Sequence, residues 1–331
     1  MKIAVDAFGG DNAPFEIVKG AVDALKANKG FEVVLVGKQQ PIQDLLDQFG
    51  WHERVEIVDA PDVIGCDEAP VMAIRRKKDS SIVRMFNLLS EGKVDACMSA
   101  GSSGAILAGG IFLIHRLPGV DRPAFCSVLP TVTGGTVVLG DSGANTDCKS
   151  EWLLQFAKMG DAYKRCMLGC EDVKIGLLSN GAEDEKGNEL TKATHQLLKE
   201  SGLHFVGNCE AREILSGDYD VIVADGFDGN VALKSAEGTA QAVFGLLKEG
   251  IASSFRAKLG ALLLKPVLMG IKRKMDYSNY GGAALLGVSK PVVKIHGSAK
   301  AKSVAAAIVQ CVKMVESDTV GKVAAYMEKS E

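Results

Sequence analysis

Short runs of β-branched and other apolar residues alternate with segments of helical period along most of the chain. Besides Ile3–Val5, the apolar runs predict strands within segments 32–37, 55–60, 95–101, 124–130, 136–141, 173–181 and 220–226. Most of these runs end in Gly, Ser, Asn or Asp, and helical patterns separate most of them. This alternation predicts a mostly parallel sheet that is covered by helices on both faces. We expect residues 1–331 to form a single α/β domain.

The first predicted strand ends in the stretch VDAFGGD, which Pro14 and the periodic segment FEIVKGAVDAL follow. This order predicts a strand, a tight glycine turn and a helix that has proline in its first turn. A helix N-terminus after such a turn favours an anion. The spacing matches neither the dinucleotide fingerprint nor the P-loop.

The alternation stops in segment 231–275, which has a long helical pattern that contains Pro266. We expect a helical hairpin inserted at 231–275, with its bend near Pro266. Apolar Leu262, Leu263, Leu264, Leu268 and Met269 stand beside cationic Lys258, Lys265, Lys272 and Arg273. Two interpretations stay open, a core or dimer-interface helix and an amphipathic tip on an anionic membrane.

Composition narrows the function. The 331 residues are 47% hydrophobic, carry a net charge of −3 and include 6% aromatic residues, which disfavours nucleic acid as a partner. The eight cysteines are scattered, and Cys166 and Cys170 have no second pair or histidine cluster beside them, so we expect no metal. Neither a signal-peptide pattern nor a membrane-spanning apolar run is present, so we expect a cytoplasmic protein.

Four glycine-rich loops follow predicted strands and suggest a shared phosphate-bearing ligand. We expect these loops to gather at the carboxyl ends of the strands, which is where doubly wound sheets bind ligands. Ser102 and Ser103 begin a helix there, with hydroxyl and backbone donors. The loops supply these candidates for binding phosphate or substrate: Asp6, Gly9, Gly10, Asp11, Ser102, Ser103, Gly104, Asn145, Asp225 and Gly229.

Two further residues stand at loop-to-helix junctions. Lys186 follows Glu183, Asp184 and Glu185, which favour its charged form, although an exposed lysine explains the pattern as well. Asn230 is predicted to open a helix, either as an N-cap or as a functional amide.

Taken in order, these motifs resemble the bacterial phosphate acyltransferases of phospholipid synthesis. They are VDAFGGDNAP, SAGSSGA, RLPGVDRPA, GANTDCKSEWLLQFAKMG, GLLSNGAEDEKGNEL, DVIVADGFDGNVALKSAEG, DYSNYGGAALLGV and KIHGSAKAK, and they extend from residue 3 to about residue 302. Phe8 stands where the family usually has Met, and Ser102-Ser103 where it usually has Asn-Thr. The second difference keeps a hydroxyl but loses a side-chain amide.

The resemblance implies that a fatty acyl group passes from the thioester of acyl carrier protein to inorganic phosphate, giving acyl phosphate and the free carrier thiol. It implies Lys186 and Asn230 as catalytic residues and no cofactor. It also implies a Rossmann-like fold similar to isopropylmalate dehydrogenase and phosphotransacetylase, a homodimer and peripheral membrane association. The acyl phosphate would then pass to a glycerol-3-phosphate acyltransferase.

Other functions remain to be weighed against this one. Cys148 is an alternative thioester-exchange nucleophile, although no histidine partner is evident. A nicotinamide-dependent dehydrogenase shares the implied fold, but the chain lacks a dinucleotide fingerprint. A lipid- or carrier-binding scaffold would keep the fold and the basic hairpin without catalysis.

Overall fold

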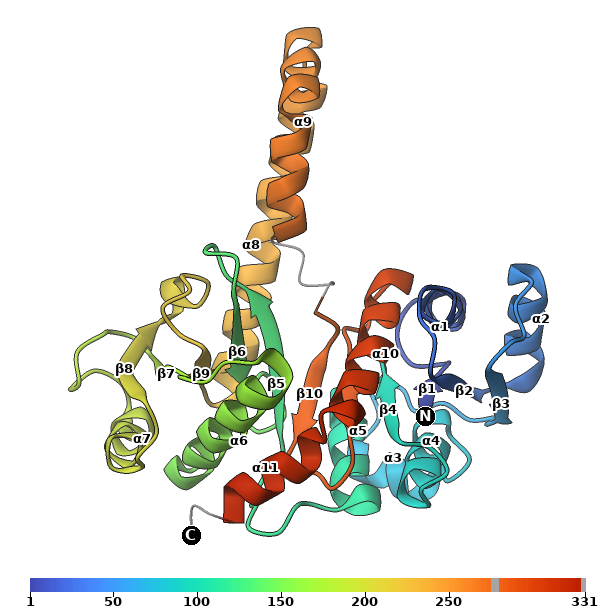
Figure 1. The fold of residues 1–331 in the computed structure, drawn as a ribbon, viewed down its shortest axis with the longest axis horizontal. Helices are drawn as coiled ribbons and strands as arrows, with labels where there is room; N and C mark the ends of the chain where they lie inside the picture. Colours follow the sequence, from blue (N-terminus) through green and yellow to red (C-terminus); the bar gives the residue numbers. More distant parts are fainter. Residues whose placement is uncertain (275–279, 329–331) are drawn as a thin grey trace.

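The computed structural model describes residues 1–274 and 280–328, and within them the strands form one eleven-stranded sheet (Figure 1). Its order is β3-β2-β1-β4-β11-β10-β5-β6-β9-β7-β8. The strands are β1 (Lys2–Asp6), β2 (Glu32–Gly37), β3 (Val55–Asp59), β4 (Ala96–Ser99), β5 (Ala124–Pro130), β6 (Thr136–Gly140), β7 (Ile175–Ser179), β8 (Phe205–Glu210), β9 (Val221–Val223), β10 (Ala283–Leu286) and β11 (Val292–Lys294). The mostly parallel α/β fold predicted from the sequence is confirmed.

The two halves of the sheet run in opposite directions. Antiparallel pairing joins β11 to β10, β10 to β5 and β5 to β6, whereas the pairs on either side are parallel. The carboxyl ends of β1 and β4 therefore lie at one end of the sheet, and those of β6, β7 and β9 lie at the other. The expectation that all four glycine loops gather at the same strand ends is wrong, because it assumed one strand direction.

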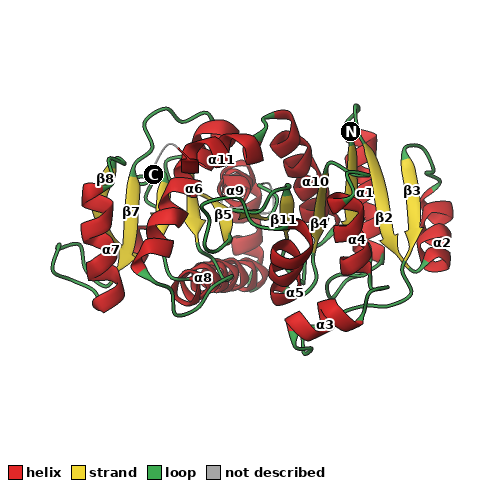
Figure 2. Ribbon diagram, turned by 90° about the horizontal axis from the view of Figure 1, so that it is seen from below, coloured by secondary structure: helices red, strands yellow, loops and turns green. Residues whose placement is uncertain are grey.

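Helices cover both faces of the sheet (Figure 2). One core lies where α1, α6, α10 and α11 pack on the first face, and smaller cores lie under α3, α4 and α5 and under the start of α8 on the second. Bounds are α1 (Phe15–Ala27), α2 (Gln39–Phe49), α3 (Pro70–Arg76), α4 (Ser81–Ser90), α5 (Ser103–Gly109), the π-helical η1 (Gly110–Ile114), α6 (Ser150–Leu168), α7 (Glu189–Glu200), the 3-10 turn η2 (Ala211–Glu213), α8 (Gly226–Ala252), α9 (Phe255–Lys274), α10 (Ala301–Glu316) and α11 (Thr319–Glu328).

Helices α8 and α9 form a hairpin that projects from the body of the protein (Figure 1). The bend predicted near Pro266 is wrong: the turn lies at Ser253 and Ser254, and Pro266 lies inside α9. Serine hydroxyls satisfy backbone groups at this turn, because Ser253 Oγ donates to the Gly250 carbonyl (2.7 Å) and Ser254 Oγ accepts from the Ala257 N–H (3.1 Å). Met275, the predicted last residue of the hairpin, lies outside the described residues.

The hairpin exposes an unusual number of large apolar side chains. Phe255, beside the turn, is 80% exposed, and Leu263 is 77% exposed. Leu262, Leu264 and Met269 are also exposed, whereas Leu268 is half-buried. Because α9 starts at Phe255, these leucines and Met269 lie along its flank, away from the turn. Within the described residues, no helix combines the length and apolarity that crossing a bilayer requires.

Candidate active site

A groove of about 910 Å³ runs along β5 on the face of the sheet that α5 and α8 cover. Phe125, Ser127, Val128 and Leu129 of β5 line it, so it reaches from one end of the central strands to the other. Ser102, Ser103 and Gly104 lie on its wall, and so do Gly143 and Asn230. The groove thus brings together predicted residues whose loops lie at opposite ends of the sheet.

Basic side chains make this groove suitable for an anion, and we call it the cationic groove. Lys234, Lys294, His296, Lys300 and Lys302 line it. Most come from the segment KIHGSAKAK, to which the sequence analysis gave no role beyond the family likeness. The signal was present there as three lysines and one histidine within nine residues.

Burial shifts the pKa values of two groups in the cationic groove, Lys294 and Glu237. It lowers the pKa of the Lys294 ammonium, with the nearby Lys234 acting in the same direction, and it raises the pKa of the Glu237 carboxyl. Lys294 Nζ donates to the Ile295 carbonyl at 2.9 Å. Burial therefore favours the neutral forms of both the Lys294 amine and the Glu237 carboxyl.

The start of α8 fixes Asn230 against the loop after β6. Asp225 is the N-cap, accepting from the Phe227 N–H at 2.7 Å and from the Cys148 N–H at 2.8 Å. Asn230 is therefore not the N-cap, since α8 begins at Gly226. A Cβ at Gly229 would lie 2.0 Å from the Asp141 carbonyl oxygen, so only glycine allows this approach. The Asn230 amide consequently packs on Gly143 at the groove.

Asp141, which the sequence analysis missed, holds this loop together. Its buried carboxylate accepts from the backbone N–H groups of Phe125 (3.0 Å), Gly143 (3.1 Å) and Asn145 (2.7 Å). The Asn145 side-chain amide donates to the Asp141 carboxylate (2.9 Å) and to the Pro123 carbonyl (2.8 Å). Both amide hydrogens of Asn145 are thus used inside the protein, and the predicted phosphate contact by Asn145 is not part of this geometry.

The glycines of the first loop serve close packing. A Cβ at Gly9 would lie 2.5 Å from the Asp6 carboxylate and 2.7 Å from the Gly101 nitrogen, and one at Gly10 would lie 2.8 Å from the Gly297 carbonyl. Asp6 is buried and accepts from Ser99 Oγ at 2.6 Å, and burial raises its pKa. The Asp11 backbone N–H donates to the Gly297 carbonyl (2.8 Å). This loop braces the walls of the cationic groove without lining it.

Lys186 lies apart from the cationic groove, in the loop between β7 and α7. The Asn208 amide donates to the Glu183 carbonyl at 2.7 Å, and Asp184 pairs with Lys199 at 2.5 Å, so the loop is anchored at both sides. The Lys186 side chain is exposed and packs by its methylenes toward Gly181. Within one chain, the structure does not bring Lys186 and Asn230 to the same groove.

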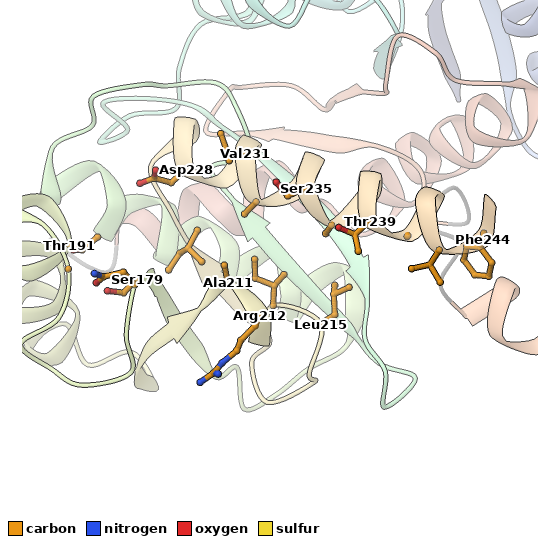
Figure 3. A pocket seen from close by; sticks show the side chains of 18 of the residues that line it. Ser179, Thr191, Ala211, Arg212, Leu215, Asp228, Val231, Ser235, Thr239 and Phe244 are labelled. Atoms are coloured by element: carbon orange, nitrogen blue, oxygen red, sulfur yellow. The ribbon is translucent and has the colours of Figure 1, made fainter. Parts of the chain in front are cut away.

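A second and larger groove of about 1280 Å³ begins beside this loop and follows α8 toward the hairpin (Figure 3). We call it the apolar groove. Its polar end includes Ser179, Asn188, Thr191 and Asp228. Its remaining lining is mostly apolar, with Arg212, Ser235 and Thr239 as polar members: Ala211, Ile214, Leu215, Val231, Ala232, Ala236, Ala240, Val243, Phe244, Leu247 and Ile271.

The two grooves share α8 as a wall. Asn230, Lys234 and Glu237 line the cationic groove. The α8 residues that line the apolar groove are Asp228, Val231, Ala232, Ser235, Ala236, Thr239, Ala240, Val243, Phe244 and Leu247. These spacings of three and four residues place each set on one side of the helix. Both grooves reach the first turns of α8, where Asp228, Asn230 and Val231 lie.

Two other features bear on the chemistry. Burial, together with Asp225, raises the pKa of the Cys148 thiol to about 12, so its nucleophilic thiolate is disfavoured. Among the side chains of residues 1–274 and 280–328, no group of three or more His, Cys, Asp or Glu is placed to hold a metal ion.

Comparison with solved structures defines the fold class. The chain superposes on a phosphotransacetylase from Streptococcus pyogenes with a TM-score of 0.61, at 18% identity, covering 97% of this chain and 94% of that one. A branched-chain phosphotransacylase from Enterococcus faecalis gives a TM-score of 0.60 at 13% identity, covering 95% and 99%. The protein has the phosphotransacetylase-like α/β fold, which confirms that part of the fold prediction.

Sequence comparison then defines the family. The family model described as "Fatty acid synthesis protein" matches residues 1–322. A phosphate acyltransferase from Geobacillus thermodenitrificans is 49% identical over 330 residues and covers 100% of both chains, and one from Clostridium acetobutylicum is 48% identical, covering 99% of each. The chain therefore belongs to the phosphate acyltransferase family of fatty acid synthesis proteins, as the motif resemblance predicted.

Proposed function

We propose that this protein transfers a fatty acyl group from the thioester of acyl carrier protein to inorganic phosphate. The observation that carries the proposal is the full-length similarity to phosphate acyltransferases, at nearly half of all positions. The cationic groove supports it independently, because Ser103 and the lysines around it form a site suited to a small oxyanion. The full-length relatives, which are phosphate acyltransferases at 48–49% identity, favour this activity over that of a dehydrogenase.

The reaction needs no covalent enzyme intermediate. An oxygen of bound phosphate attacks the thioester carbonyl carbon, a C–O bond forms, and the C–S bond breaks. The sulfur leaves as a thiolate and takes up a proton to become the free carrier thiol. Holding phosphate beside the thioester makes the bimolecular step effectively unimolecular. The raised pKa of Cys148 favours this direct route over acyl transfer through a protein thiol.

We assign phosphate to the cationic groove, where Ser102, Ser103 and Gly104 begin α5 opposite Lys294 and Lys300. Asn230 is the proposed donor to the carbonyl oxygen, which becomes negative in the transition state. Lys186 keeps its proposed catalytic role as the cation that assists the departing sulfur. Its loop adjoins the polar end of the apolar groove through Gly187 and Asn188.

The remaining expectations concern partners and place. We propose a homodimer that associates with an anionic membrane surface through the exposed apolar residues of the hairpin. Acyl phosphate joins a long apolar chain to a labile anhydride, so delivery at a membrane to a glycerol-3-phosphate acyltransferase avoids loss to water.

The direct test incubates the purified protein with palmitoyl-acyl carrier protein, with and without inorganic phosphate. We expect free carrier thiol and palmitoyl phosphate to appear in equal amounts, and only when phosphate is present. Thiol release that is independent of phosphate would indicate a thioesterase, and no release at all would favour a binding scaffold.

A further inference from the structure

We propose that the apolar groove along α8 holds the fatty acyl chain, with its carbonyl end at the β7–α7 loop and its methyl end toward the turn of the hairpin. This inference rests on the proposed acyl transfer and adds a binding site for one part of the substrate. It gives Ala232, Ala236 and Ala240 of α8 a role that the reaction chemistry had not assigned.

The first argument is the gradient of polarity along the groove. Ser179, Asn188 and Asp228 gather at one end, whereas Val243, Phe244 and Leu247 lie at the other. Figure 3 shows this order, with Ser179, Thr191 and Asp228 at one side of the view and Phe244 at the other. A fatty acyl thioester has the same order, a polar head followed by a uniform apolar chain.

The second argument is an unpartnered hydroxyl at the polar end. Ser179 Oγ is buried, and within the described residues it has no hydrogen-bond partner. It lies 3.2 Å from the position a Cβ would take on Gly187, the residue that follows Lys186. A buried hydroxyl without a partner is costly, and an oxygen of the bound acyl thioester would satisfy it.

The third argument is shape. Ala232, Ala236 and Ala240 form one row along α8 at four-residue spacing, and each is half-buried. Their small side chains leave the space that the groove occupies. From Asp228 to Leu247 the helix rises by about 28 Å, at about 1.5 Å per residue. Half of a fluid bilayer core of about 30 Å gives about 15 Å as the length of a disordered chain. A fully extended long chain is longer and reaches the level of Ala240, about 18 Å from Asp228 along the helix.

The test places a phenylalanine at different distances from the polar end of the groove, at two positions of the alanine row. Ala240→Phe fills the groove far from its polar end, and Ala232→Phe fills it near that end. We expect Ala240→Phe to lower kcat/KM for palmitoyl-acyl carrier protein relative to octanoyl-acyl carrier protein by roughly tenfold or more, since terminal methylenes lose their site. Ala232→Phe is expected to lower both values.

Ala242→Phe is the matched control, because residue 242 lies on α8 but lines neither groove. It should leave the palmitoyl-to-octanoyl ratio at the wild-type value. The oligomeric state of each variant is measured by light scattering, because a second copy of the chain is the other occupant that an apolar face can have.

The outcomes separate the inference from the function it rests on. No turnover of either thioester by the wild type would overturn the proposed function itself. A wild type that is active, with Ala240→Phe keeping the wild-type ratio, would overturn only the groove assignment. A loss equal for both chain lengths, with a change in oligomeric state, would also overturn it and assign the face to a contact between copies.

Discussion

The cationic groove and the apolar groove lie on opposite sides of one helix and differ in almost every property. The first is formed by loops and strands from both halves of the sheet and concentrates Lys234, Lys294 and Lys300. The second is formed by the second half alone and is continuous with the hairpin. Phosphate suits the cationic groove, and a fatty chain suits the apolar one. The helix keeps these two environments apart along its length, and they meet only at the first turns of α8.

The largest effects are expected when one donor is removed on each side, the Asn230 amide or the Lys186 amine. We expect Asn230→Ala to lower kcat by roughly a hundredfold or more, because its amide acts mainly in the transition state. Lys186→Ala should lower kcat by a similar factor, because the thiolate leaves less readily without this cation. Steady-state rates and melting temperatures of both variants provide the measurement.

Gln241→Ala is the control for Asn230→Ala, since it changes the same helix outside both grooves. Asn230→Ala with a near-normal rate and an unchanged melting temperature would remove this amide from the mechanism. If only Lys186→Ala kept its rate, the chemistry would belong to the cationic groove alone.

The hairpin is the proposed membrane-binding part of the apolar side of this comparison. Phe255→Glu at the turn, and Leu263→Glu with Leu268→Glu on the flank, should each lower binding to anionic vesicles by about tenfold or more, because burying one such side chain is worth roughly 1.5–3 kcal/mol. Binding should also weaken with salt, since Arg256, Lys258 and Lys265 are exposed cations.

Co-sedimentation measures this binding, and Gln48→Glu on α2, far along the chain from the hairpin, gives the same charge change as Phe255→Glu. A greater loss at Phe255 indicates that the turn enters the membrane first, whereas a greater loss for the leucine pair indicates that the flank lies on it. Equal partitioning of the wild type and both variants would mean that these side chains pack inside an assembly.

The cationic groove makes a pH-dependent prediction. Burial lowers the pKa of Lys294, so this side chain loses its charge at a lower pH than an ordinary lysine. Phosphate affinity is therefore highest below that pKa and declines as the pH rises through it. We expect the KM for phosphate to increase severalfold over this alkaline range, while the KM for acyl carrier protein thioester changes little.

Lys294→Arg keeps the charge at every accessible pH, so it should remove this step from the profile. Comparing the two proteins in the same buffers cancels the ionisation of phosphate itself. An identical alkaline step in Lys294→Arg would assign the titration to another group.

The smallest effect is expected at Cys148. Because the pKa of its thiol is raised to about 12, Cys148→Ser should stay within about twofold of the wild-type rate. Iodoacetamide at pH 8 should label the exposed Cys66 before Cys148, which peptide mass spectrometry can follow. An acyl group trapped on Cys148 during turnover would contradict the direct attack by phosphate.

Strong local patterns in the sequence predicted the fold well. Runs such as EVVLVG and TVVLGD became β2 and β6, because β-branched residues between turn residues have few other packed arrangements. The strands β8, β10 and β11 were not predicted. Segment AALL of β10 has no strand signature of its own, and it becomes a strand only by antiparallel pairing with β5 and β11.

The site was predicted less completely, since it depends on strand direction and on contacts distant in sequence. Ser103, Gly104 and Asn230 line one groove, as expected, although their strands point opposite ways. Gly9 carries the same sequence signal as Gly104 but fills a tight contact with Asp6 and Gly101. Pro266 was predicted to bend the hairpin, but the serine pair at its turn provides the caps that a proline cannot.

Because α8 lines both grooves, insertions in this helix are restricted to lengths that keep its two faces in place. Inserting one residue into α8 between Asn230 and Ala240 would turn everything beyond it by about 100° and point the alanine row away from its groove. Seven inserted residues make about two whole turns, which would restore the faces and lengthen the apolar groove by about 10 Å. Engineering a longer acyl site should therefore proceed in heptads, and length variation tolerated in this helix should follow the same step.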